Sequence, residues 1–476
     1  MKIRSLLLGS VAAAGLSTGG AFAADLGVLT SLDVCDALGL SGLTISSDTN
    51  CLQITGEVKY KFTWGDFTNE SFGVATPADG GVQWIGGGHG ALPGTDDNLD
   101  WRSRFDAWIK FVATADSDFG PAKAVLKLKQ VTDARVDNEG VRYYGGSTTG
   151  DEGTIAGLPV NGPGSVVLDE AYVSIGDSTV IMAGKKGSIM NKGDDEPLTW
   201  LDLFNSEDVD RGVSWGPLAG TDGLDDGGMV IQVTSDLGNG FTISAGLEKL
   251  DNQQANLLVP ASSLHGAGTA VGVIAYAGEG ISAHITGAAA GVLDGEVEAW
   301  GVHAGFAGTF DNFKVVLAGA FGHSEDQILI GTDHDYWNVL ASASATFDMF
   351  TIAGAVEAVD DGTDTDLGAG ASVSFAVTEG VTVNVGGRWY QQNIAGLGDA
   401  WQVAAGVSAA VTESITVTGE LGYVDNGSDD LIYGSAKLAW APGGGYTSSI
   451  KGTVTSETNS ADVGYKLETE FKKTFE

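Results

Sequence analysis

The chain has 476 residues, of which 62 are Asp or Glu and 24 are Lys or Arg, giving a formal net charge of −38 at pH 7. A protein this acidic is repelled by nucleic acid and by anionic lipid surfaces, which argues against a general DNA- or RNA-binding role. The 72 glycines have no three-residue period, and 18 Phe, 11 Trp and 11 Tyr favour a folded chain. Composition therefore excludes a collagen and argues against a disordered protein.

Residues 1–23 have the pattern of a secretory signal peptide. Lys2 and Arg4 form the charged start, an apolar stretch follows, and Ala-Phe-Ala at 21–23 is a small-x-small cleavage site. The alternative, an uncleaved anchor helix, requires a longer apolar run. We therefore expect export with cleavage after Ala23. The remaining chain has no apolar run approaching the roughly 18 residues of a membrane helix, so any membrane span must be made of strands.

The next predicted unit, 24–51, contains both cysteines of the chain, Cys35 and Cys51. In an exported protein such a pair is expected to form a disulfide, worth about 3 kcal/mol on the chain-entropy model. A catalytic thiol is the alternative, but no histidine lies nearby in the sequence. The segment is therefore predicted to be a disulfide-closed unit ahead of the first long strand.

From residue 52 onward, apolar and polar residues alternate with a period of two, which predicts strands with one apolar and one polar face. In 57–64, one parity holds Val58, Tyr60, Phe62 and Trp64, and the other holds Glu57, Lys59, Lys61 and Thr63. The alternation recurs in 101–113, 312–322 and 414–423. Ionised side chains on one face of a wide sheet require water, which a barrel lumen supplies, whereas a soluble sandwich or solenoid would bury the aromatic face instead.

Tight turns and longer acidic connections alternate between these strands. The predicted tight turns are Asp116–Gly120, Gly176–Ser178, Leu237–Gly240, Gly278–Gly280, Phe310–Asn312, Phe347–Met349, Thr378–Gly380, Thr412–Ser414 and Pro442–Gly445. The longer connections include 65–100, 133–165, 185–226, 250–268, 324–335, 359–365 and 425–430. This asymmetry is typical of an outer-membrane β-barrel. Nine hairpins, an opening strand at 52–64 and a closing strand at 461–475 predict an all-β, antiparallel transmembrane barrel over 52–476, with an even number of strands, up to 20.

Two stretches near the start carry a family resemblance: Val34-Cys35-Asp36-Ala37, and Thr-Asn-Cys-Leu-Gln-Ile-Thr-Gly-Glu-Val at 49–58. Together with weaker matches at 170–175, 180–185 and 237–241, they resemble the alphaproteobacterial porin family (porin family 2). The resemblance implies a trimeric barrel of 16 strands whose third loop folds into the pore. The chain departs from the family in its length, which leaves 18 or 20 strands open, and in ending on Glu476 after an aromatic residue.

Basic residues are concentrated in the early strands, on the water-facing parity. They would form a positive wall on one sector of the barrel, made of Lys59, Lys61, Arg102, Arg104, Lys110, Lys123, Lys127 and Lys129. The alternative reading of these residues is simple solvation of a polar sheet face.

Segment 185–226 is the predicted constriction loop. Its candidate site residues are Lys185, Lys186, Lys192, Asp194, Asp195, Glu196, Asp202, Glu207, Asp208 and Asp210. Pro197 follows an acidic run and precedes apolar residues, which predicts a short helix in the loop. An acidic loop facing a basic wall would create a transverse field that favours hydrophilic solutes over apolar ones. The alternative is an ordinary solvated surface loop.

No motif indicates an enzyme. The six histidines lack metal-binding spacing, and an acidic wet loop explains His334 between Asp333 and Asp335 more simply than a metal site. The glycine stretch 86–90 lacks the Lys-Ser/Thr of a phosphate loop, and neither a Gly-x-Ser-x-Gly sequence nor a catalytic acid pair stands out. We therefore expect no catalysis, no cofactor and no metal.

These patterns together predict a porin of the Gram-negative outer membrane, surrounded by lipid and lipopolysaccharide. It would form a water-filled channel for passive diffusion of small hydrophilic solutes and ions, and the excess of acid near the mouth predicts a weak cation preference. The resemblance adds a homotrimer. A substrate-specific porin is an alternative within the same class. An acidic surface-layer or adhesin protein is the alternative from another class, although no sorting signal or sandwich repeat is visible, and an exported lipase or glycosidase ranks lower still.

Overall fold

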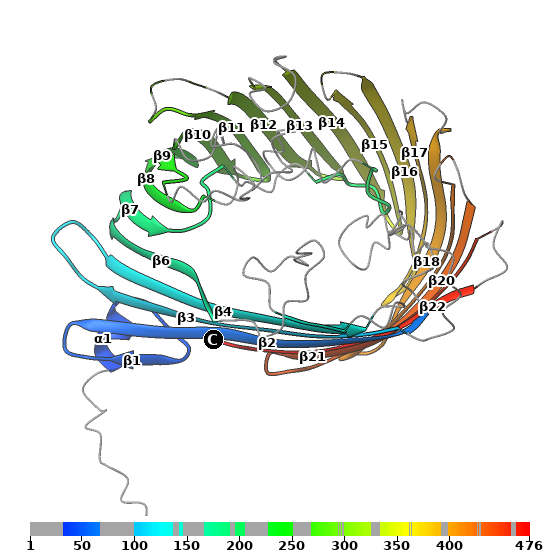
Figure 1. The fold of residues 1–476 in the computed structure, drawn as a ribbon, viewed down its shortest axis with the longest axis horizontal. Helices are drawn as coiled ribbons and strands as arrows, with labels where there is room; N and C mark the ends of the chain where they lie inside the picture. Colours follow the sequence, from blue (N-terminus) through cyan, green and yellow to red (C-terminus); the bar gives the residue numbers. More distant parts are fainter. Residues whose placement is uncertain are drawn as a thin grey trace, which may run out of the picture.

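Twenty long antiparallel strands close into a ring in the computed structural model (Figure 1). The structure describes residues 32–66, 100–136, 142–145, 166–190, 196–204, 227–250, 268–293, 295, 297, 299–324, 334–360, 362, 364–391, 398–425, 427, 430–457 and 463–476. The even number and the count of 20 predicted from the hairpins are confirmed. The 16 strands implied by the family resemblance are wrong for this chain, because its extra length forms additional hairpins.

The strands of the ring follow one another in chain order. They are β2 (Asn50–Asp66), β3 (Asp100–Ala115), β4 (Ala122–Val136), β6 (Val167–Gly176), β7 (Thr179–Lys185), β8 (Met229–Gly238), β9 (Phe241–Glu248), β10 (Thr269–Gly278), β11 (Ile281–Ala290), β12 (Ala299–Phe310), β13 (Phe313–Ser324), β14 (His334–Phe347), β15 (Phe350–Asp360), β16 (Thr365–Thr378), β17 (Val381–Gln391), β18 (Ala400–Thr412), β19 (Ile415–Asp425), β20 (Asp430–Gly443), β21 (Tyr446–Glu457) and β22 (Val463–Phe475). The short β5 (Arg142–Gly145) pairs with the end of β4. The ring closes where β22 pairs with β2, with Gly56 opposite Phe475.

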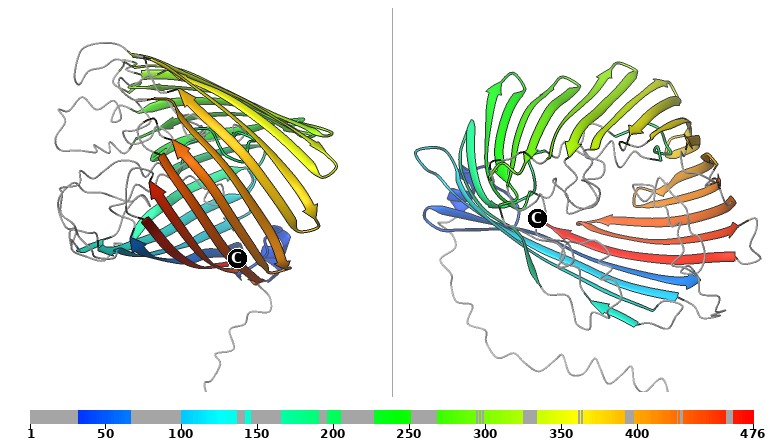
Figure 2. Two further views of the ribbon diagram at one scale, coloured as in Figure 1. Left: turned by 90° about the vertical axis from the view of Figure 1, so that its right-hand side faces the viewer. Right: turned by 45° about the horizontal axis from the view of Figure 1, so that its top comes forward.

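All nine predicted tight turns join neighbouring strands, and they gather at one end of the ring (Figure 2). The turn between β8 and β9 shows why the sequence folds there: Asn239 and Gly240 have φ of 55° and 83°. Two successive residues with positive φ give a turn whose twist matches that of the flanking strands, and Asn and Gly are the residues that adopt it most readily.

The outer face of the ring is apolar, as the alternation predicts. Leu317, Val356 and Leu421 are 48 %, 55 % and 70 % exposed, while the residues next to them along each strand point to the other face. An exposed apolar face this extensive is unstable in water and suits a hydrocarbon surround.

Two bands of aromatic side chains border this outer face. The band near the longer connections contains Trp64, Trp101, Trp300, Phe321, Trp389, Trp401, Tyr423 and Tyr465, and the band near the tight turns contains Phe241, Tyr276, Phe310, Phe313, Phe347, Phe350, Phe375, Trp440 and Tyr446. Trp300 and Phe310 lie in opposite bands on β12. At about 3.3 Å per residue and a tilt of about 40°, the strand between them rises about 25 Å, which is the height of the apolar band in outer-membrane barrels.

The N-terminal segment forms a small unit beside the closure of the ring. The helix α1 (Leu32–Ala37) is joined to β2 by the predicted disulfide between Cys35 and Cys51, which is confirmed, and the strand β1 (Thr44–Ser46) pairs with β2. Beyond the last pair of β22, β1 continues along the same edge of β2, with Thr44 opposite Gln53. The predicted signal peptide lies outside the described residues. Among the described residues, no helix is long and apolar enough to cross a membrane.

Candidate functional site

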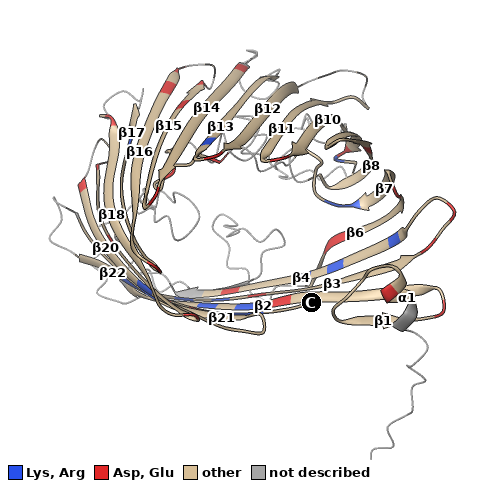
Figure 3. Cartoon of the chain, turned by 180° about the vertical axis from the view of Figure 1, so that it is seen from behind, with Lys and Arg blue, Asp and Glu red and all other residues tan. Residues whose placement is uncertain are grey.

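Lys, Arg, Asp and Glu residues gather on one sector of the ring, made of β20 to β22, β2 to β4 and β6 (Figure 3). We call this sector the charged wall. Residues that lie opposite each other on neighbouring strands point to the same face of the sheet. Lys451 lies opposite Glu468, and Lys61 lies opposite both Glu470 and Arg104. These residues all share the parity opposite to the exposed apolar side chains.

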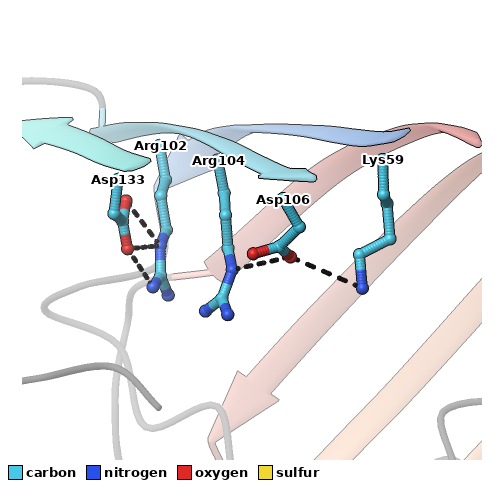
Figure 4. Close-up of polar contacts among 5 residues, drawn as sticks. All are labelled: Lys59, Arg102, Arg104, Asp106 and Asp133. Carbon is cyan, nitrogen blue, oxygen red and sulfur yellow. Dashed lines mark hydrogen bonds and ion pairs between the residues drawn. The ribbon is translucent and has the colours of Figure 1, made fainter. Parts of the chain in front are cut away.

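The charged wall consists of ion pairs and is not uniformly basic (Figure 4). Lys59 Nζ lies 3.5 Å and Arg104 Nε 3.2 Å from Asp106 Oδ2, so one carboxylate serves two cations. Arg102 Nε donates to both oxygens of Asp133, at 3.1 and 2.8 Å. Fixed, partly exposed pairs of this kind contribute little to stability but hold charges at set positions along a lumen.

The same pairing continues on both sides. Lys61 Nζ lies 2.9 Å from Glu468 Oε1, and Lys110 Nζ donates to Glu170 Oε2 at 2.8 Å. Lys127 Nζ lies 2.6 Å from Asp169 Oδ2 and 5.2 Å from the centre of the Trp108 ring. Lys123 and Lys129 share the inward parity of Lys127 on β4. Strand parity predicts that Asp106 shares the inward face of Arg104, but the pairing of the cations with Asp133, Glu170 and Glu468 depends on contacts between strands and was not predicted.

A segment between β7 and β8 lies inside the ring (Figure 1). We call its described residues, 186–190 and 196–204, the inserted segment. Its first residues are held by the buried carboxylate of Glu248. This group accepts a hydrogen bond from the Ile189 N–H at 3.1 Å and another from Gln232 Nε2 at 2.7 Å. Next to it, Met190 is fully buried against Val271 and the neighbouring small residues of β10 to β12. The inserted segment is therefore seated on the wall from its first residues.

Residues 196–204 lie against the inner faces of β13 to β20. The Leu198 and Trp200 N–H groups donate to the hydroxyls of Ser342 and Ser372, both at 2.9 Å. Leu203 is buried in a cluster with residues of β13 to β15, while Leu201 packs against residues of β18 to β20. The short helix predicted for this loop is wrong over 196–204, because these N–H groups bond to the wall and not to carbonyls one turn earlier.

Three glycines of the inner wall make room for this contact. A Cβ at Gly406 would lie 2.7 Å from Trp200 Cζ2, one at Gly370 would lie 3.0 Å from Leu203 Cδ2, and one at Gly386 would lie 3.2 Å from Trp200 Cε3. The glycines of β16 to β18 thus form a shallow seat for the inserted segment. Sequence reasoning missed them because glycine is common throughout this chain.

The predicted charges of the constriction loop are only partly within the described residues. Lys185 ends β7, and Lys186 Nζ lies 4.9 Å from the centre of the Tyr172 ring. Glu196 and Asp202 belong to the inserted segment, and burial raises the pKa of the Asp202 carboxyl, with Arg388 opposing this effect and Glu196 adding to it. The others, Lys192, Asp194, Asp195, Glu207, Asp208 and Asp210, lie outside the described residues.

A buried histidine pair on the inner wall was not singled out from the sequence. His284 Nε2 and His303 Nδ1 lie 2.8 Å apart on β11 and β12, and the two rings are stacked. In the part of the chain that the structure describes, no three His, Cys, Asp or Glu side chains come close enough to hold a metal ion. The pair is explained as a hydrogen-bonded contact within the wall.

Comparison with known proteins gives matches among solved structures alone: no family model matches the chain, and no curated protein matches it. The anion-selective porin from Comamonas acidovorans is 13 % identical with a TM-score of 0.36, covering 90 % of this chain and 100 % of that one. A BenF-like porin from Pseudomonas fluorescens Pf-5 is 10 % identical with a TM-score of 0.45, covering 89 % and 98 %. A triple mutant of the Rhodopseudomonas blastica porin is 14 % identical with a TM-score of 0.34, covering 89 % and 100 %.

The architecture itself defines the class of fold. A closed antiparallel ring, tight turns at one end, an apolar exterior between two aromatic bands, a segment folded against the inner face, and an ionised sector on that same inner face make this chain a porin-like β-barrel.

Proposed function

We propose that this protein is an outer-membrane porin that lets small hydrophilic solutes and ions diffuse passively through the lumen of the barrel. The observation that carries this proposal is the opposition of two surfaces inside one ring: the charged wall with its fixed ion pairs, and the inserted segment seated across from it on β13 to β20. A soluble sandwich would place its apolar side chains between the sheets, whereas here they point outward.

The chemistry of the two surfaces supports passive selection for hydrophilic solutes. Lys and Arg on the charged wall, together with Glu196 and Asp202 on the inserted segment, would orient water and dipolar solutes across the pore. An apolar solute that enters that field displaces oriented water and makes no polar contact in return, so its passage is disfavoured. Nothing in this arrangement requires a cofactor or a reaction step.

Location and partners follow from the same proposal. The signal peptide would direct the chain to export with cleavage after Ala23, and the outer face would contact lipid and lipopolysaccharide. A homotrimer is part of the proposal through the family resemblance at 34–58 and needs its own test.

Reconstitution tests the function. Purified protein incorporated into liposomes should allow small sugars to enter at rates that fall with sugar size, and it should give stepwise conductance in a planar bilayer. The same preparation should show a band on a gel that shifts when the sample is boiled. A heat-insensitive soluble protein that adds no conductance would overturn the proposal.

A further inference from the structure

We propose that Arg388 is a positioning residue that holds the end of the inserted segment against the inner wall and thereby fixes the width of the constriction. This inference rests on the proposed channel function. It assigns to a residue of β17 a role in placing a segment that lies more than 180 residues earlier in the chain.

The contact is made by the planar guanidinium. Arg388 Nη1 donates to the main-chain carbonyl oxygens of Asp202 and Leu203, both at 3.3 Å, and the guanidinium carbon lies 4.1 Å from the centre of the Phe204 ring. One side chain thus contacts three successive residues of the inserted segment. Arg388 itself is 5 % exposed, so these contacts are made away from bulk water.

The guanidinium is fixed from behind by a chain of buried polar side chains. Its Nε donates to Gln402 Oε1 at 2.8 Å, Gln402 Nε2 donates to the Tyr433 hydroxyl at 2.9 Å, and that hydroxyl donates to Glu420. Gln402, Tyr433 and Glu420 are 0 %, 1 % and 6 % exposed. A planar guanidinium that is held along one edge can rotate little, so the positions of the donors on its other edge are fixed. The hydrogen-bonded series of buried side chains therefore determines where the two carbonyl groups lie.

Packing alone does not provide this precision. Leu201 and Leu203 fill sites on the wall by non-directional apolar contact, and the hydrogen bonds to Ser342 and Ser372 hold the segment only at Leu198 and Trp200. Arg388 supplies the directional contacts further along, at Asp202 and Leu203. Removing the Arg388 donors would take away the hydrogen bonds that they give to the carbonyl oxygens of Asp202 and Leu203. The segment would then spend more time away from the wall, and the pore would change width.

Single-channel recording of Arg388→Met in planar bilayers tests the proposal, with the intact barrel checked by the shift of the boiled band. Met keeps the apolar stem and loses every donor. We expect the time spent in conductance levels other than the main one to rise about tenfold or more, the factor by which losing hydrogen bonds to a charged donor shifts a two-state ratio. Arg388→Lys keeps the charge and a donor, and should lie between Arg388→Met and the original protein.

Arg104→Met is the matched control. It also removes one guanidinium from the inner wall, but the Nε contact of Arg104 is with Asp106 on its own strand. It should change the ratio of cation to anion permeability and leave the distribution of conductance levels close to that of the original protein.

A second variant covers the case in which Arg388→Met does not fold. Arg388→Met combined with Gln402→Met replaces both hydrogen-bonding partners by apolar side chains, so that neither is left unpaired. If a folded variant lacking Arg388 keeps the original conductance levels, or if Arg104→Met broadens them equally, Arg388 is not the positioning residue. If the unmodified protein forms no channel, the proposed function fails first, and the two failures are thereby distinguished.

Discussion

The carboxyl group of Asp202 lies where Arg388 contacts the inserted segment, because the main-chain carbonyl of the same residue is one of the two that accept a hydrogen bond from Arg388. Burial raises the pKa of this carboxyl above the usual value, and the nearby guanidinium only partly offsets the effect. The seated segment therefore binds a proton more tightly than a released one, and the charged form weakens the seat.

A pH dependence follows for Asp202. Its contribution to seating should be complete below the ordinary carboxyl pKa of about 4 and should be lost as the pH rises through the raised pKa. Departures from the main conductance level should accordingly become more frequent as the pH rises over that window, and Asp202→Asn should flatten the profile. Asp348→Asn, in a tight turn, is the control and should keep the original profile. Identical profiles for the original protein and Asp202→Asn would contradict the prediction.

Side chains on the strands could be assigned to a face from the sequence because a period of two leaves only two choices. Lys59 and Tyr60 were correctly placed on opposite faces for this reason. Arg388 could not be identified in the same way. Parity predicts that it faces inward, but its role depends on a segment from between β7 and β8 reaching β17, and nothing local in the sequence specifies that contact.

At the scale of a strand, the two faces should respond very differently to the same substitution. Leu317 lies on the outer face of β13, midway between Phe313 and Phe321 of the two aromatic bands, and is 48 % exposed. Leu317→Arg should lower the free energy of unfolding in a bilayer by about 2–4 kcal/mol, the cost of a charge near the midplane. Thr418→Arg, on the inner face of β19, is the control and should cost much less. Denaturant titration in lipid vesicles measures both, and equal losses would contradict the assignment of faces.

The N-terminal unit gives a second prediction for an element. Cys35 and Cys51 are 16 residues apart, so their disulfide removes about 3 kcal/mol of chain entropy from the unfolded state on the loop-closure model. Cys35→Ser combined with Cys51→Ser should lower the temperature at which the band shifts on a gel. A reducing agent should lower it for the original protein and leave the double variant unchanged. No difference between oxidised and reduced protein would show that the bond does not stabilise the barrel.

Turns and disulfide were predictable because their signals are local: Asn239-Gly240 specifies its own turn, and two cysteines offer one pairing. The glycine seat on β16 to β18 could not be predicted, since the glycines that accommodate Trp200 are recognisable only when the position of the inserted segment is known. The predicted helix in 185–226 was wrong over 196–204 for a related reason: the apolar spacing there fits separate sites on the wall as well as one face of a helix.

The net charge of the whole molecule predicts its ion selectivity. The chain carries a net charge of −38, and carboxylates such as Asp106 and Glu468 stand among the cations of the charged wall. We expect a weak cation preference, because an acidic surround concentrates cations at the mouth while the paired wall favours neither sign strongly. Reversal potentials under a salt gradient measure it, and raising ionic strength should reduce it. A clear anion preference would contradict the prediction.

The junction of β2 with β22 has a consequence for how the ring is built. Every other neighbour pair in the ring joins strands that are close in the chain, so the sheet can grow hairpin by hairpin, whereas Phe62 and Thr469 meet across 407 residues (Figure 1). The edge of β2 therefore stays unpaired until the C-terminal strand has been placed, and an unpaired strand edge can pair with a strand of another chain. β1 pairs with β2 along residues 51–53, and the disulfide joins the neighbouring helix α1 to the same strand, so part of that edge is already covered. The stretch that stays open is the one that β22 later pairs with.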